Sequence, residues 1–259
     1  MTATPATRGV ELWLVDLTRA ADDLRSAEAS TPRLSVGDRE RLAAIASPIV
    51  RAEREVSWIA LRLVLARVAG DGRYDGVPLQ RSSTGKPFIS DAPLSFSLSH
   101  SGGFALIAAA ASPSFALGID IQAHAPLRMS DDRAARLIAA GERLANAAAE
   151  LRRDAAEGRD VAALRAFVRI EAVAKATGLG LAHVLARLGV LAASAASDGA
   201  AGSADGRFAD ALAELDIRDI AMPAGLPVPC HAAVAATRGA LPSHLQLRHL
   251  PDQIAMLPI

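Results

Sequence analysis

The chain has 259 residues, which at about 150 residues per domain fits one large domain or two modest halves. Basic and acidic residues number 28 each, so the formal net charge is zero, which argues against a dedicated nucleic-acid binder. A hydrophobic content of 51% and a charged content of 22% exclude an intrinsically disordered chain. Aromatic residues make up only 3%, so we expect a core of Ala, Leu and Val.

The single cysteine, Cys230, excludes an intramolecular disulfide framework and a thiolate zinc cluster. No apolar run approaches the ~20 residues that a membrane span needs, and the N-terminal residues lack the apolar stretch of a signal peptide. We therefore expect a cytoplasmic protein with no membrane and no nucleic acid among its partners.

In chain order, residues 10–17 predict a first strand and residues 35–69 a helical stretch. Ser35 can cap this stretch, and Pro48 is expected to divide it into two helices. One apolar helical face follows from the spacing of Trp58, Leu61, Leu65 and Val68.

Residues 84–87 then predict a turn, and residues 94–100 alternate as a strand with its serines on one face. With the apolar run 104–111 they predict a hairpin that has one buried strand, and a further strand follows at 117–121.

The second part of the sequence predicts helix over residues 133–178, with two neighbouring stripes on the last helix. The stripes are Ala163, Phe167, Ile170 and Ala174, and Leu164, Val168, Glu171 and Lys175. Residues 192–206 predict a loop, residues 217–220 and 231–237 predict strands, and the tail 245–259 has no clear period.

Several polar motifs are each explained by ordinary structure when taken alone. A Gly-Lys-Pro sequence is most often a turn. A histidine at a strand end is usually a hydrogen-bonded edge residue, and Asp120 can lie on an exposed strand face. Glu171 and Lys175 can form a helix pair that contributes only about 0.2–0.5 kcal/mol.

In their order along the chain, however, these motifs resemble those of the 4′-phosphopantetheinyl transferases of the larger, two-half type, such as the surfactin-synthetase-activating enzyme. The matching segments are Gly85-Lys86-Pro87, Ser99-His100-Ser101, Gly118-Ile119-Asp120-Ile121-Gln122, and the Glu171-Ala172-Val173-Ala174-Lys175 helix. The resemblance covers roughly residues 10–240, and its spacing between the aspartate and glutamate motifs is about that of the family.

The resemblance implies Mg²⁺-dependent transfer of 4′-phosphopantetheine from coenzyme A to a serine of an apo-carrier protein, acyl or peptidyl, with release of adenosine 3′,5′-bisphosphate. It implies Asp120, Gln122 and Glu171 as metal ligands, Glu171 also as the base for the serine proton, and Lys175 as a phosphate contact. It implies that Ser99 and His100 hold the 3′-phosphate and that Lys86, Arg54 and Arg62 bind the nucleotide. Carboxylate oxygens suit a hard cation such as Mg²⁺ beside a pyrophosphate.

The sequence departs from the family pattern at four places. Gln122 stands where the family has a glutamate, Ile170 where it has a lysine, and Phe167 where it has a tryptophan. Arg136-Leu137-Ile138 stands where the family carries an aromatic stretch. A diverged, weakly active or non-catalytic homologue that binds coenzyme A or a carrier protein is therefore an open alternative. A serine hydrolase using Ser99 or Ser101 is less favoured, because the chain lacks a Gly-x-Ser-x-Gly elbow.

The fold implied by the resemblance is α+β, a pseudo-dimer of two similar halves that each pack a small antiparallel sheet on a long helix, with coenzyme A in the cleft between them. We expect an N-terminal half at 1–116 and a C-terminal half at 117–259 that carries the metal motifs. The chain is then expected to be a monomer. The resemblance implies a carrier protein of fatty-acid, polyketide or non-ribosomal peptide synthesis.

Overall fold

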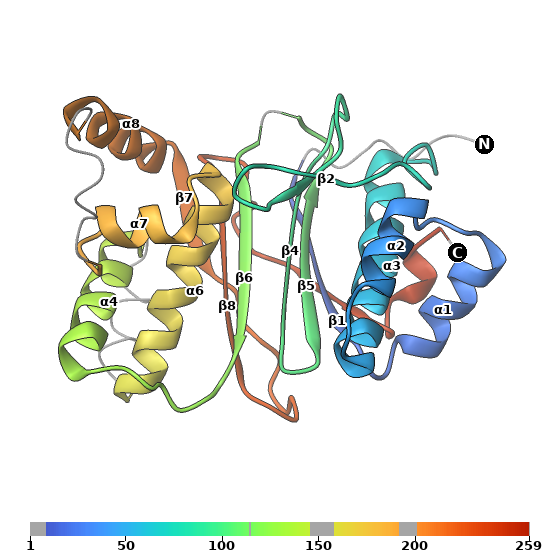
Figure 1. The fold of residues 1–259 in the computed structure, drawn as a ribbon, viewed down its shortest axis with the longest axis horizontal. Coiled ribbons are helices and arrows are strands. Elements are labelled where there is room, and N and C mark those ends of the chain that lie inside the picture. The colour runs from blue at the N-terminus through green and yellow to red at the C-terminus, as the bar shows by residue number, and fades with distance from the viewer. Residues whose placement is uncertain (1–8, 114, 146–157, 192–200, 259) are drawn as a thin grey trace. The chain divides into compact units, whose positions relative to one another are not determined.

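The computed structural model describes residues 9–113, 115–145, 158–191 and 201–258, with the side chains of 201–206 excepted. The chain is α+β, with small antiparallel and mixed sheets and helices (Figure 1). It divides into two compact units, Met1–Phe115 with Pro242–Ile259, and Ala116–Leu241. Residues 242–259, which the sequence analysis assigned to the second half, are thus grouped with the first unit.

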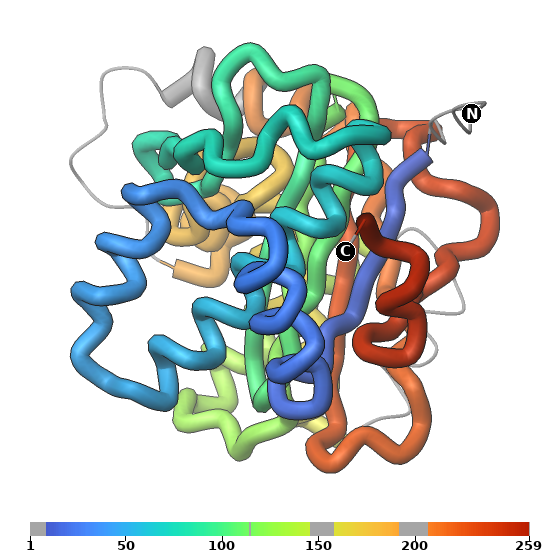
Figure 2. The backbone as a smooth tube through the Cα atoms, turned by 90° about the vertical axis from the view of Figure 1, so that its right-hand side faces the viewer, coloured from blue at the N-terminus to red at the C-terminus, as the bar shows by residue number. Residues whose placement is uncertain are grey.

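The sheet of the first unit is mixed and has the strand order β4-β5-β1-β9. Its strands are β1 (Glu11–Asp16), β4 (Ser95–Ser101), β5 (Phe104–Ala110) and β9 (Leu247–Leu250). The β4–β5 hairpin is antiparallel as predicted, and β1 pairs antiparallel with β5. The tail lacked a periodic pattern, yet it supplies β9, which runs parallel to β1 (Figure 2), and a 3₁₀ helix at Ile254–Met256.

Three helices and a short hairpin complete the first unit. The elements are α1 (Ala21–Ser30), α2 (Val36–Ala43), α3 (Pro48–Ala69), β2 (Gln80–Arg81) and β3 (Pro87–Phe88). Both predicted helix signals are confirmed: Ser35 caps α2 through a capping box, and Pro48 begins α3. The predicted apolar face of α3 is buried in the core of this unit.

The second unit packs helices on an antiparallel sheet of order β6-β8-β7. Its elements are β6 (Leu117–Ala123), β7 (Leu215–Asp219), β8 (Cys230–Thr237), α4 (Asp131–Leu144), α6 (Arg159–Thr177), α7 (Leu181–Arg187) and α8 (Ala201–Ala213). Figure 1 shows α6 beside the sheet and α4 next to α6. Of the predicted loop 192–206, residues 192–200 lie outside the described part, and residues 201–206 begin α8, which the sequence analysis missed.

None of the described helices is long and apolar enough to cross a lipid bilayer.

Helix α6 approaches β6 so closely that only glycine fits at one strand position. A Cβ atom added to Gly118 would overlap the carbonyl oxygen of Ala172 and the amide nitrogen of Ala176, both in the backbone of α6. Small side chains on the helix permit this approach, since Ala172 and Ala176 are both buried there. The glycine of the Gly-Ile-Asp motif is therefore required by packing.

Gly118→Ala should destabilise the protein by about 3 kcal/mol or more, because two backbones must separate to admit the methyl group. The measurement is the free energy of unfolding in urea. Gly158→Ala is the control, because a Cβ there has no atom within 4 Å, and its cost should stay under about 1 kcal/mol. Equal losses for the two variants would contradict the packing argument.

Candidate functional site

Asp120 lies at the centre of a charged cluster between β6 and α6. Its carboxylate is fully buried and accepts a hydrogen bond from Lys175, with 2.8 Å between Oδ1 and Nζ. The same ammonium donates to the carbonyl oxygen of Ile119 at 3.1 Å and forms an ion pair with Glu171 Oε1 at 3.2 Å. The structure therefore brings together three residues that the sequence analysis grouped only by motif.

Glu171 and Lys175 each keep 23% of their side chain exposed, whereas Asp120 keeps none. Burial, followed by repulsion from the Asp120 carboxylate, raises the pKa of Glu171, and the Lys175 ammonium opposes this rise. The raised pKa makes the Glu171 carboxylate a stronger base than an ordinary glutamate. Because Glu171 and Lys175 reach solvent and Asp120 does not, Glu171 and Lys175 are the members of the cluster that a substrate can meet.

Gln122 extends the cluster along the same face of β6. Alternate strand residues share a face, and the Gln122 amide donates from Nε2 to Asp120 Oδ2 at 3.4 Å. Two carboxylates and an amide oxygen form a donor set that suits a hard divalent cation. Among the described residues no group of three or more His, Cys, Asp or Glu side chains is arranged to hold a metal ion. The Lys175 ammonium lies between the two carboxylates, so it supplies the positive charge there.

Lys86 lies in the turn that joins β2 to β3. Gly85, with φ of 86°, donates to the Ser82 carbonyl oxygen at 2.9 Å, and Ser82 donates to the Lys86 carbonyl oxygen at 2.9 Å. The predicted Gly-Lys-Pro turn is thereby confirmed. Burial lowers the pKa of the Lys86 ammonium to about 8.

Arg54 on α3 lies close enough to Arg81 on β2 for the two charges to repel each other. Burial, followed by this repulsion, lowers the pKa of Arg54. Its Nε atom is buried and makes no hydrogen bond. Arg81 donates to the Gly85 carbonyl oxygen at 2.8 Å, which ties it to the Lys86 turn. The sequence analysis missed Arg81. A predicted hairpin around the Gly-Lys-Pro turn would have placed Arg81 opposite Pro87 and thus near Lys86.

Ser99 and His100 leave opposite faces of β4, because they are adjacent in a strand. His100 pairs in register with Ala105, which belongs to the core under α3, so His100 is on that face. Ser99 pairs with Leu106 and is on the other face. The resemblance assigned both side chains to the same phosphate. Because they leave opposite faces of β4, one phosphate could reach both only from the end of that strand.

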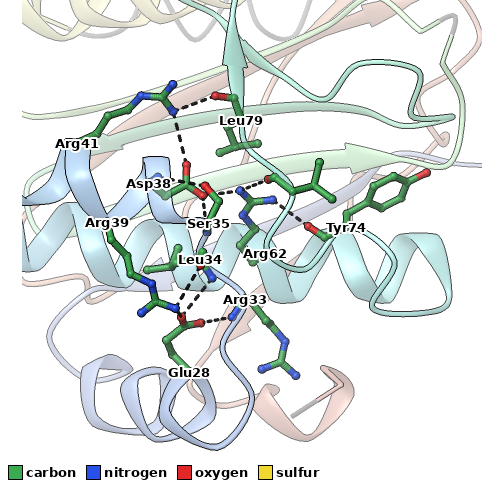
Figure 3. A network of polar contacts seen from close by, with 11 residues as sticks. Glu28, Arg33, Leu34, Ser35, Asp38, Arg39, Arg41, Arg62, Tyr74 and Leu79 are labelled. Carbon is green, nitrogen blue, oxygen red and sulfur yellow. Dashed lines mark hydrogen bonds and ion pairs between the residues drawn. The ribbon is translucent and has the colours of Figure 1, made fainter.

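Arg62 lies in the core of the first unit, where its guanidinium is only 1% exposed (Figure 3). It pairs with the fully buried Asp38 at 2.5 Å and donates to the carbonyl oxygens of Tyr74 and Val77 at 3.0 and 2.6 Å. Figure 3 shows that this pair joins α2 and α3 to the segment that leads to β2. These contacts give Arg62 a structural role, so we do not retain it among the ligand-binding candidates.

Ile170, at a position where the transferases that the sequence resembles have a lysine, is fully buried in the core of the second unit. Its neighbour Arg169 is equally buried and forms a bidentate pair with Asp219, with both distances 2.8 Å. The charged helix residue at this point of α6 is thus Arg169, and its partner is the buried Asp219 carboxylate of β7. Position 170 has no access to a ligand in this chain.

No protein-family model matches the chain, and no curated protein was found to be similar to it. The function is therefore inferred from the geometry of the site.

Asp38→Asn should lower the free energy of unfolding by about 3–5 kcal/mol, because it leaves the Arg62 charge buried without its counter-ion. Asp252→Asn is the control: its pair with Arg19 has side chains 56% and 63% exposed, and the loss should stay below about 1 kcal/mol. Urea unfolding measures both. If Asp38→Asn cost no more than the control, the structural role given to Arg62 would be wrong.

Proposed function

We propose that this protein is a Mg²⁺-dependent 4′-phosphopantetheinyl transferase that modifies a serine of an apo-carrier protein with the phosphopantetheine of coenzyme A. The observation that carries the proposal is the Asp120–Lys175–Glu171 cluster. A buried carboxylate, a lysine and a partly exposed carboxylate with a raised pKa converge there. These groups suit an attack on a pyrophosphate linkage by a hydroxyl group.

In this reaction the serine oxygen forms a bond to the phosphorus that carries pantetheine. The bond from that phosphorus to the bridging oxygen breaks, and adenosine 3′,5′-bisphosphate leaves. Glu171 takes the serine proton, directly or through water, as its raised pKa permits. Asp120 and Lys175 hold Glu171 in place, and Lys175 is the cation of this cluster that can contact a phosphate.

A Mg²⁺ ion would be held by Asp120, Glu171 and the carbonyl oxygen of Gln122, and it would supply positive charge to the pyrophosphate. With both carboxylates ionised, Lys175 leaves the cluster one net negative charge, and a glutamate at position 122 would add another. Gln122 therefore favours weaker binding of Mg²⁺ or binding through more water molecules.

In the first unit we assign the nucleotide phosphates to Lys86 and Arg54, with Arg81 as an addition, and the 3′-phosphate to His100 and Ser99. Support comes from the repulsion between Arg54 and Arg81, since two cations held side by side favour an anion. Lys86 belongs to the same hairpin as Arg81.

The proposal also includes the pseudo-dimeric fold of the transferase family, a monomeric chain, a cytoplasmic location, and a carrier protein of the acyl or peptidyl kind as partner. Each unit combines a small sheet with a long helix, α3 in the first and α6 in the second, which is compatible with two similar halves.

A non-catalytic protein that binds coenzyme A or a carrier protein is the second candidate. Two observations favour it: the amide of Gln122 replaces a charged ligand, and Ile170 is buried in the core. Such a protein would bind the nucleotide and leave the carrier unmodified.

Incubation with coenzyme A, Mg²⁺ and a panel of apo-carrier proteins should raise the mass of at least one carrier by one phosphopantetheine group, as read by mass spectrometry. Asp120→Asn and Glu171→Gln should each lower the rate by a hundredfold or more, because a metal ligand or the base is lost. Asp132→Asn is the control, since its side chain is 91% exposed, and it should keep the full rate.

Near-full activity of Glu171→Gln would show that the base is misassigned. Nucleotide binding without modification of any carrier would instead support the non-catalytic candidate.

The affinity for adenosine 3′,5′-bisphosphate should fall as the pH rises from 7 to 9, because Lys86 loses its proton with a pKa of about 8. A phosphate monoester, with its second pKa near 6, keeps its charge over this range. We expect a loss of roughly tenfold by calorimetry, the size of one charged hydrogen bond. Lys86→Arg should flatten the profile, because arginine stays charged. An unchanged profile in that variant would assign the titration to another group.

A further inference from the structure

Two imidazole rings lie near each other at one end of the β6–β8 strand pair, and the proposed reaction does not use them. The ring centroids of His124 and His231 are 6.3 Å apart, and the ring planes are tilted by 58°. His124 is exposed and His231 is half-buried, so solvent reaches the pair. The two residues are far apart in the sequence, and the strand pairing brings them together.

The register of the two strands places both rings beside Gln122. Residues directly opposite each other in an antiparallel pair share a face, and Gln122 is opposite His231. His124 follows Gln122 by two residues and so continues the same face, with its backbone N–H donating to the Pro229 carbonyl oxygen at 2.7 Å. Cys230 is adjacent to His231 and therefore leaves the opposite face.

We propose that His124 and His231 bind a transition-metal ion of the Zn²⁺ class, with water completing the coordination. Imidazole nitrogen is a preferred ligand for Zn²⁺, Ni²⁺ and Co²⁺, whereas Mg²⁺ selects oxygen ligands. With zinc–nitrogen distances of about 2.0–2.1 Å, two imidazoles on one tetrahedral ion have centroids roughly 5 Å apart. The ring separation must therefore shorten by about 1 Å on binding, which requires a torsional change at the exposed His124.

Such an ion would link the end of β6 to the start of β8. Because it binds the folded arrangement of the two strands, it stabilises the folded protein against unfolding. The site is distinct from the carboxylate cluster, although Gln122 lies between the two. It does not depend on the proposed transfer reaction, and its test needs neither coenzyme A nor a carrier protein.

The test is a titration of the full-length protein with Zn²⁺ in a non-chelating buffer by calorimetry, and with Co²⁺ by visible absorption. We expect about one ion per chain and a melting temperature that rises with Zn²⁺. His124→Ala and His231→Ala should each weaken binding at least tenfold and abolish that rise. His183→Ala, which removes an exposed histidine from α7, should leave both readouts unchanged.

Two further variants locate the ion. Cys230→Ser should bind Zn²⁺ as the unaltered protein does, and a loss there would overturn the assignment in favour of the thiol. Asp120→Ala should also keep the site, and a loss there would place the ion at the carboxylates. Equal affinity of the unaltered protein and His124→Ala, with circular dichroism showing both folded, would overturn the proposal outright.

Discussion

The close approach of α6 to β6 at Gly118 is the constraint on which the candidate site depends. Because no side chain separates the strand backbone from Ala172 and Ala176, the next residue on that strand face, Asp120, is held against the helix. Lys175 then reaches both Asp120 and the Ile119 carbonyl oxygen. A bulkier helix surface would hold the two elements apart and break these contacts. Small side chains permit the close approach of α6 to β6. The alanine-rich, aromatic-poor composition therefore has a direct consequence for the site.

Electrostatics at this contact follow from burial. Asp120 has no access to water, so its charge needs a partner within hydrogen-bond distance, and Lys175 provides one from the helix. Glu171, one turn earlier on α6, pairs with the same Lys175 ammonium. The pKa of Glu171 is nevertheless raised, because one lysine does not offset both the burial of Glu171 and its repulsion by Asp120. The cluster thus contains a structural ion pair and a more reactive carboxyl group. The same three side chains therefore join β6 to α6 and form the candidate site.

Periodicity and turn chemistry predicted the elements that bury one face, such as α3 with its Ser35 and Pro48 signals and the β4–β5 hairpin. They did not predict β9 or α8, whose sequences lack a strong period. The strand β9 pairs with β1, which is far away in the sequence, so no local pattern indicates it. Asp120, Glu171 and Lys175 could be singled out from the sequence because their motifs are local. The burial of Arg62 was not predicted, because its counter-ion, Asp38, is supplied by another helix, and no local pattern records that pairing.

Gln122 lies on the β6 face between the carboxylate cluster and the histidine pair. On one side it donates to the Asp120 carboxylate, and on the other it stands opposite His231. A glutamate at this position would add a second negative charge beside a buried carboxylate and strengthen a site for hard cations. The amide avoids that repulsion and offers only a neutral oxygen, so under the proposed function Mg²⁺ would be held more weakly or through more water molecules.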